Sequence, residues 1–133
     1  MKRVIIAIIF ITLSIVVGIY SMNETTSKCN RMMSRIEKGI KESTELQESD
    51  SHDKKIEFYN SMESLNDAWE ENSKFFYFFF NNDEIRDIEI NIEKLPTHAK
   101  CGNIEEANLC LVEALEDFEY LKNSSVVNLN NIF

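Results

Sequence analysis

The chain opens with an unbroken apolar run, Val4 to Met22, directly after the cationic stub Met1-Lys2-Arg3. Nineteen residues at 1.5 Å per residue make a helix of about 28 Å, which matches the hydrocarbon core of a bilayer. No residue in the run is charged, and its less hydrophobic members are Thr12, Ser14, Gly18 and Ser21. We therefore expect residues 1–22 to form a stub and transmembrane anchor, and residues 23–133 to form a separate domain.

A cleavable signal peptide is the alternative interpretation of this run. The apolar core of a signal peptide is about 7–15 residues long and is followed by a small-x-small cleavage site. Here the core is longer, and residues 19–23 contain no Ala-x-Ala pattern. No cysteine follows small residues at the end of the run, which argues against a lipoprotein. The sequence favours an uncleaved anchor.

The charges on either side of the run bear on orientation. Lys2 and Arg3 favour a cytoplasmic N-terminus. A count of basic residues favours the opposite orientation, because more of them follow the run than precede it: Lys28, Arg31, Arg35 and Lys38. Long domains translocate largely regardless of their charge. We therefore expect a single-pass signal-anchor protein of the cell membrane, with a cytoplasmic N-terminus and an extracytoplasmic domain.

The domain that follows is strongly acidic and lacks helix breakers. Removing Lys2 and Arg3 from the 14 basic residues leaves 12 against 23 acidic residues, a net charge of −11. Such a balance excludes a generic nucleic-acid binder, which needs a basic face for the phosphates. One proline and three glycines in 133 residues indicate helices, because a protein of short strands and many turns needs more glycine and proline.

Apolar residues at alternating steps of four and three predict four helices. The stripes are Cys29, Met33, Ile36, Ile40, Ser43 and Gln47; Phe58, Met62, Leu65, Trp69, Asn72, Phe76 and Phe79; Ile85, Ile88, Ile92 and Leu95; and Ala107, Leu111, Ala114, Phe118 and Leu121. We expect Pro96 to kink or end the third helix, and the fourth to stop near Lys122. Short connections then predict an all-α, antiparallel up-down bundle of about four helices.

The residues that carry chemistry are few. Cys29, Cys101 and Cys110 are an odd number without a C-x-x-C motif, so we expect packed thiols; a Cys101–Cys110 or Cys29–Cys110 bridge is the alternative. His98-x-x-Cys101 has zinc-like spacing but lacks a fourth ligand. No positioned base accompanies a nucleophile, and no glycine-rich phosphate loop is present. We predict no catalytic residue, no cofactor, no metal site and no enzymatic activity.

The aromatic run Phe75-Phe76-Tyr77-Phe78-Phe79-Phe80 exceeds what a helix core needs. Six successive residues sweep about 600° around a helix, whereas a core face takes about 140°. We expect Phe76 and Phe79, with Phe75 and Phe80, to pack inward, and Tyr77 and Phe78 to point away. An interaction patch is predicted at Phe75, Tyr77, Phe78, Phe80, Ile132 and Phe133. The alternative is that a neighbouring helix or the C-terminal tail covers these rings.

Short motifs spread over the chain are Met1-Lys2-Arg3-Val4-Ile5-Ile6, the Trp69 region, Asn82-Asp83-Glu84-Ile85-x-x-Ile88, Glu105-Glu106-Ala107 and Asn131-Ile132-Phe133. In these the chain resembles the uncharacterised family of small single-span, membrane-anchored helical proteins of clostridia and related Gram-positive spore formers. The resemblance implies a bacterial membrane location and makes a multi-pass membrane protein a candidate partner. It implies no activity. Family members often carry histidine in place of Asn82, and proline is unusual at Pro96.

Two functions fit these observations. The first is a non-enzymatic, membrane-tethered interaction module that serves as an accessory subunit of a bacterial membrane complex. The alternative is an extracytoplasmic helical domain that senses a ligand or signal. A stoichiometric membrane partner in detergent extracts would favour the first function, and a monomer carrying a small molecule would favour the second.

The anchor interpretation makes a direct prediction. Ile9→Arg and Ile15→Arg, both inside the apolar run, should each raise the cost of membrane insertion by about 2.5–3.5 kcal/mol and release the protein from membranes. Fractionation of cells into membrane and soluble material measures the change. A wild-type protein found soluble, with a new N-terminus near residue 22, would contradict the anchor.

Overall fold

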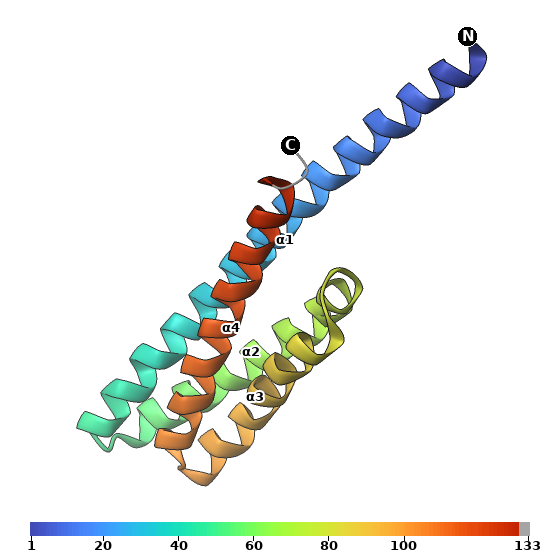
Figure 1. Cartoon of the computed structure of the whole chain (residues 1–133). Helices are drawn as coiled ribbons and strands as arrows, with labels where there is room; N and C mark the ends of the chain where they lie inside the picture. The colour runs from blue at the N-terminus through green and yellow to red at the C-terminus, as the bar shows by residue number, and fades with distance from the viewer. Residues whose placement is uncertain (131–133) are drawn as a thin grey trace.

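The structure, a computed structural model, describes the backbone of residues 1–130 and the side chains of residues 1–125. Its four elements are α1 (Lys2–Glu48), α2 (His52–Phe79), α3 (Asn82–Cys101) and α4 (Ile104–Asn130) (Figure 1). No strand occurs within this described part of the chain. The prediction of an all-α protein is therefore confirmed.

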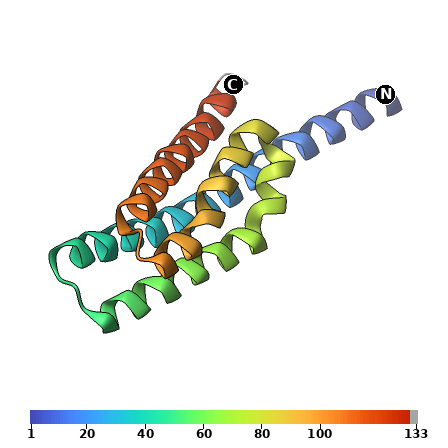
Figure 2. The ribbon, with the colours of Figure 1, turned by 90° about the horizontal axis from the view of Figure 1, so that it is seen from below.

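The four helices form an up-down bundle in which each helix has two neighbours. α1 packs against α2 and α4, and α3 packs against the same two helices (Figure 2). The predicted antiparallel bundle is confirmed. The first part of α1 extends alone beyond the bundle, so that the molecule has a compact body and a single-helix arm (Figure 1).

The arm is the apolar run identified in the sequence. One 18-residue window of α1 is apolar and long enough to cross a membrane, and none of that window is buried in the protein. A signal sequence meets the same criterion of length and composition. α1 passes from residue 22 to residue 23 without a break, so the expected boundary between anchor and domain lies inside one helix of 47 residues.

The face that α1 buries differs in part from the predicted one. Cys29, Ile36 and Ser43 are buried as expected, but Met33 and Ile40 are only half-buried and Gln47 is exposed. The buried residues of this helix are Thr25, Cys29, Met32, Ile36, Gly39, Ser43 and Leu46. The stripe has the same period but lies slightly rotated around the helix, because α1 faces two neighbours, α2 and α4, at once.

Close packing at Gly39 explains the rotation. A Cβ atom at this position would lie 2.7 Å from the Met62 methyl of α2 and 3.2 Å from Leu111 of α4. Beside it, Asn108 of α4 donates a hydrogen bond to the Ser43 hydroxyl at 2.6 Å, and Ser43 donates to the Ile40 carbonyl at 2.8 Å. This hydrogen bond joins a buried hydroxyl of α1 to α4 and helps to fix the relative position of the two helices.

The predicted core faces of the other three helices are confirmed, except at the end of α2. All the stripe residues predicted on α3 and α4 are buried, and so are Phe58, Met62, Leu65, Trp69 and Phe76 of α2. Asn72 is half-buried, and Phe79 is exposed rather than packed inward. Phe79 is the last residue of α2, and its ring packs against Phe75 and Phe78 at the surface instead of in the core.

Pro96 does not end α3, so that alternative of the prediction is wrong: the helix continues to Cys101. Proline in a helix interior removes one hydrogen bond at a cost of about 3 kcal/mol. Here Leu95 and Ala99, on the same face, are buried against the bundle, and this packing outweighs the local cost. Gly102, at φ 76°, then ends the helix.

The end of α3 is a Schellman motif. Asn103 N–H donates to the His98 carbonyl at 2.9 Å, and Gly102 N–H donates to the Ala99 carbonyl at 3.3 Å. At its other end, Asn81 caps the helix, since its side chain accepts a hydrogen bond from Asp83 N–H at 3.0 Å. These two caps fix where α3 begins and ends.

α4 is longer than predicted, because it runs past Lys122 to Asn130. Ser124 donates to the Leu121 carbonyl at 3.0 Å and Ser125 to the Lys122 carbonyl at 2.8 Å, so both hydroxyls are satisfied inside the helix. Nothing in residues 123–130 breaks a helix, as the segment has neither glycine nor proline. The end of α4 thus lies at the same end of the bundle as the arm (Figure 1).

The core makes a stability prediction at Trp69. Its ring is buried, stacks on Phe76 with centroids 5.7 Å apart and meets Phe118 edge-on at 6.1 Å. Trp69→Ala should lower the free energy of unfolding by about 3–5 kcal/mol. Chemical denaturation of the full chain in detergent, followed by circular dichroism, measures the loss.

Trp69→Phe is the matched control. The indole Nε1 is buried without a hydrogen-bond partner among the described groups, so phenylalanine keeps most of the packing and removes an unpaired donor. It should lose clearly less stability than Trp69→Ala. An equal loss for both variants, or no loss for either, would contradict the packing described for this ring.

Candidate functional site

The aromatic end of α2, residues 75–80, is the candidate site, and it is built around one buried ring. Phe76 is fully buried and contacts Trp69 on its own helix and Phe118 on α4, with ring centroids 5.7 Å and 5.5 Å away. Aromatic pairs at such distances stabilise a core beyond the area that they bury. Phe76 therefore fixes the height and rotation of the residues around it.

Lys28 joins the aromatic end to α1. Its ammonium group donates a hydrogen bond to the Asn72 side chain at 2.8 Å and lies 5.2 Å from the centroid of the Phe75 ring. A lysine over an aromatic face is a stabilising cation–π contact. Lys28 is six residues past Met22, so Phe75 lies about 9 Å beyond the end of the apolar run.

Phe78 and Phe79 are the exposed part of the site. Phe78 is 81% exposed and Phe79 is 44% exposed, with the two ring centroids 4.9 Å apart. Phe79 also meets Phe75 at 4.7 Å, so the three rings form one cluster. Because α2 runs antiparallel to α1, these residues lie about 5 Å closer to the apolar arm than Phe75 does. The prediction that Phe78 points away from the core is confirmed.

Tyr77 is placed differently from the prediction. It is half-buried against the core, and its hydroxyl donates a hydrogen bond to the Glu89 carboxylate of α3 at 2.5 Å. This hydrogen bond, together with burial, raises the pKa of Tyr77 to about 12. Tyr77 thus ties α2 to α3 and is not part of the exposed cluster.

The remaining predicted residues divide between the core and the undescribed end of the chain. Phe80 is half-buried against the core, and its backbone N–H donates to the Phe76 carbonyl at 3.0 Å. Ile132 and Phe133 lie outside the described residues. The structure therefore gathers Phe75, Phe78 and Phe79 at the surface. Sequence reasoning missed Phe79 and Lys28, although the position of Phe79 in the last helical turn was a signal.

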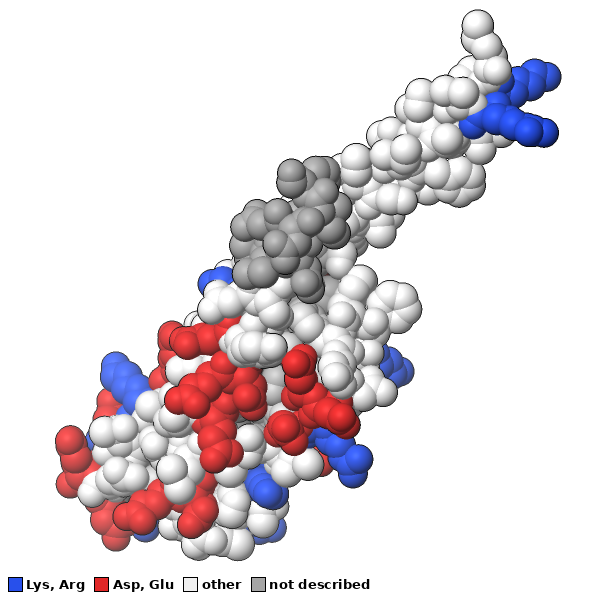
Figure 3. All heavy atoms as spheres, viewed as in Figure 1, with Lys and Arg blue, Asp and Glu red and all other residues white. Residues whose placement is uncertain are grey.

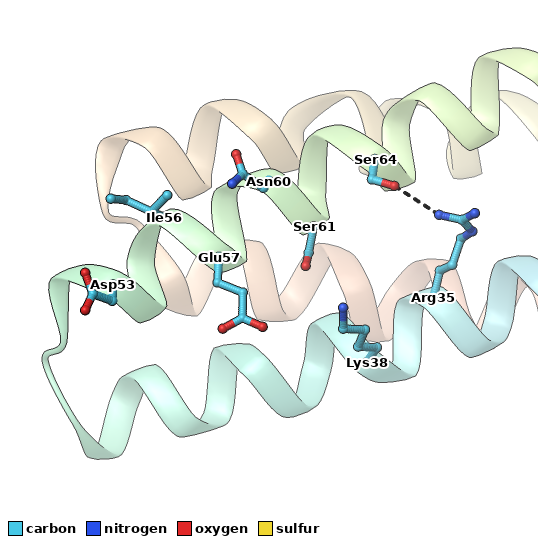
Figure 4. Close-up of a pocket in the computed structure, with 8 residues that line it drawn as sticks. All are labelled: Arg35, Lys38, Asp53, Ile56, Glu57, Asn60, Ser61 and Ser64. Carbon is cyan, nitrogen blue, oxygen red and sulfur yellow. Dashed lines mark hydrogen bonds between the residues drawn. The ribbon is translucent and has the colours of Figure 1, made fainter.

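A hollow of about 460 Å³ lies between α1 and α2 (Figure 4). Arg35 and Lys38 enter it from α1, facing polar residues of α2, and Arg35 donates to the Ser64 hydroxyl at 3.0 Å. Lys38 pairs with Glu42 at 3.3 Å. Ile56 is the single apolar side chain in the lining, so the hollow does not suit an apolar molecule.

The cysteines and acidic residues form no reactive centre in the described part of the chain. Cys29, Cys101 and Cys110 are free; Cys29 and Cys110 are buried as expected, whereas Cys101 is exposed. Within the described side chains, no group of three His, Cys, Asp or Glu residues is arranged to hold a metal ion. Burial raises the pKa of Cys29 to about 12 and also raises that of Cys110, which makes both poor nucleophiles.

These features define a class: an all-α protein with an apolar N-terminal helix that continues into a four-helix bundle. The family described as Domain of unknown function (DUF4363) matches residues 16–132, and the chain belongs to it. The matched region begins inside the apolar run, so the family domain includes the base of the arm. Neither the curated proteins nor the solved structures show a significant match to the chain.

The thiols give a prediction for chemical labelling. A maleimide applied to the folded protein at pH 7 should modify Cys101 and leave Cys29 and Cys110 unmodified, because only thiolates react and both buried thiols resist ionisation. Mass spectrometry should find one adduct on the native chain and three after denaturation. Rapid native labelling of Cys29 would contradict the packing of α1.

The same shift predicts a pH dependence. In the unfolded chain a cysteine ionises near pH 8.5, whereas Cys29 in the folded chain holds its proton up to about pH 12. The stability linked to this thiol is fully present below about pH 8.5 and declines as the pH rises toward 12, since the unfolded state then binds fewer protons. Cys29→Ala should make unfolding less sensitive to pH in that range.

Proposed function

We propose that this protein is a non-enzymatic, membrane-tethered interaction module that serves as an accessory subunit of a bacterial membrane complex. Residues 4–22 act as an uncleaved single-pass signal-anchor, with the N-terminus in the cytoplasm and the bundle outside. The partner is another membrane protein, for which a multi-pass protein is the candidate.

The observation that carries the proposal is the exposed ring pair Phe78 and Phe79 next to the apolar arm. The core of the bundle does not require these two rings, since the ring of this segment that contacts Trp69 and Phe118 is Phe76. Exposed clusters of large aromatic side chains commonly mark contact surfaces, and aromatic residues favour the depth of the bilayer interface. A surface at this height faces the extramembrane loops of a neighbouring membrane protein.

The charge distribution also favours the aromatic end of α2 as the contact surface. In the view of Figure 3, uncharged atoms cover the end of the bundle beside the arm, whereas acidic side chains gather farther from it. An acidic surface is repelled by anionic lipid headgroups. The uncharged aromatic end is therefore the part of the domain that can approach a bilayer closely.

Co-purification with a matched pair of variants tests the proposal. Phe78→Ser with Phe79→Ser should remove a stoichiometric membrane partner from detergent extracts. Ile56→Ser, which alters a side chain of similar exposure (48%) at the far end of α2, should retain it. Loss of the partner in both variants, or in neither, would contradict a contact at the aromatic end.

Depth measurements test the geometry separately. In a Cys101→Ser background, probes attached at Phe78→Cys and His52→Cys should differ, because α1 rises about 39 Å between Met22 and Glu48. Lipid-borne quenchers should quench the probe at position 78 and leave the probe at position 52 unaffected. Equal quenching at the two positions would mean that the aromatic end is not near the bilayer.

A further inference from the structure

A groove between α3 and α4 combines exposed apolar side chains with a rim of carboxylates. Two adjoining hollows of about 700 Å³ and 320 Å³ share Ile90, Asn91 and Glu113, so they form one continuous depression. Ile90 of α3 is 39% exposed and Leu109 of α4 is 57% exposed. Both side chains line the larger hollow, and we call the two together the apolar strip. None of these residues belongs to the aromatic end of α2.

The rim of the groove is acidic on both sides. Six carboxylates line it, against a single lysine, Lys94: Asp87, Glu93, Glu106, Glu113, Glu116 and Asp117. Among the described side chains, none of the six has a lysine, arginine or histidine partner within 4.0 Å. Figure 3 shows this gathering of acidic side chains on the face formed by α3 and α4. The rim therefore carries uncompensated negative charge.

The crowding of these groups is visible at Asp117. Its carboxyl is partly buried, and burial together with the charges of Asp87, Glu113 and Glu116 raises its pKa. Asp87 belongs to α3 and the other three residues to α4, so the repulsion acts across the groove as well as along one helix. A cation placed between the two helices would relieve it.

The length of the groove determines the length of the helix that it can hold. On α3 it extends from Asp87 to His98 and on α4 from Glu106 to Asp117, and either span of a helix measures about 16 Å. About 11 residues of a third helix, or three turns, cover that length. An apolar strip between charged rims is the receptor form of helix-in-groove recognition, in which apolar anchors recur at i, i+3, i+4 and i+7.

We propose that the α3–α4 groove binds a basic amphipathic helix of a partner protein, with apolar residues seated on Ile90 and Leu109 and lysine or arginine side chains facing the two acidic rims. A second copy of this chain is a poor occupant, because its own α3–α4 face would meet the groove with like charge. This surface is separate from the aromatic end, so either contact can be present without the other.

The test uses the full chain in nanodiscs of zwitterionic phosphatidylcholine and a fluorescent amidated peptide. The peptide is about 11 residues long, with leucines on one helix face and lysines on both flanks. A control peptide of the same composition is scrambled so that the leucines no longer share a face. Fluorescence anisotropy gives the Kd, and empty nanodiscs measure binding to lipid. The patterned peptide should bind and the scrambled one should bind much more weakly, with an affinity that falls as salt rises.

Two groove variants and two controls locate the binding. Leu109→Ser, and separately Glu113→Gln with Asp117→Asn, should each weaken binding about tenfold through lost apolar contact or lost charge pairs. Ile56→Ser alters an apolar residue of similar exposure to Leu109, and Glu70→Gln with Glu71→Gln neutralises two exposed carboxylates outside the groove. Both controls should change the Kd by less than about twofold. Circular dichroism on each variant confirms that the bundle is folded.

Three results would overturn the proposal. The first is equal affinity for the patterned and scrambled peptides, which would reduce the groove to a diffuse acidic surface. The second is equal weakening by the α2 control Glu70→Gln with Glu71→Gln, which has the same meaning. The third is a change of oligomeric state in the groove variants with unchanged peptide affinity, which would make a second copy the occupant. Because the aromatic end is intact in every variant, none of these results bears on the contact proposed for Phe78 and Phe79.

Discussion

The continuity of α1 is the constraint on which the rest of the structure depends. The same helix forms the apolar arm and one side of the bundle, and its packing begins at Thr25, which is buried three residues past Met22. The Thr25 hydroxyl donates to the Ser21 carbonyl at 2.8 Å, so even this polar residue leaves the helix unbroken. α2 and α4 both pack on this rod, and α3 reaches it only through them. The position of every other helix is therefore set by the one that leaves the bundle.

The fold could be predicted from the sequence wherever the core was one stripe on one helix face. The stripe residues of α3 and α4 were predicted correctly, because they repeat at helical spacing over the whole buried length of each helix. α1 was harder, since its buried face includes Gly39, a residue that hydrophobicity does not mark. The continuation of α3 through Pro96 could not be predicted either, as it depends on packing against neighbouring helices rather than on local pattern.

The candidate site was predictable in kind but not in detail. The excess of aromatic residues over core needs was visible in the six-residue run, and Phe78 is exposed as expected. The partner of Tyr77 was not visible, because Glu89 comes close only when α3 folds back on α2. The α3–α4 groove was missed for a related reason: Ile90 and Leu109 look like isolated surface residues in the sequence, and they share a hollow only once the helices are paired.

The unbroken rod has a mechanical consequence. A helix turns by about 100° per residue, so the direction in which any side chain of the arm points is locked to the direction in which Cys29, Ile36 and Ser43 face their core. A rotation or tilt of the arm must then turn the whole bundle with it, since no hinge separates them. The orientations of the aromatic end and of the α3–α4 groove about the helix axis are therefore fixed relative to the arm. A rotation of the arm is in this way transmitted directly to the bundle.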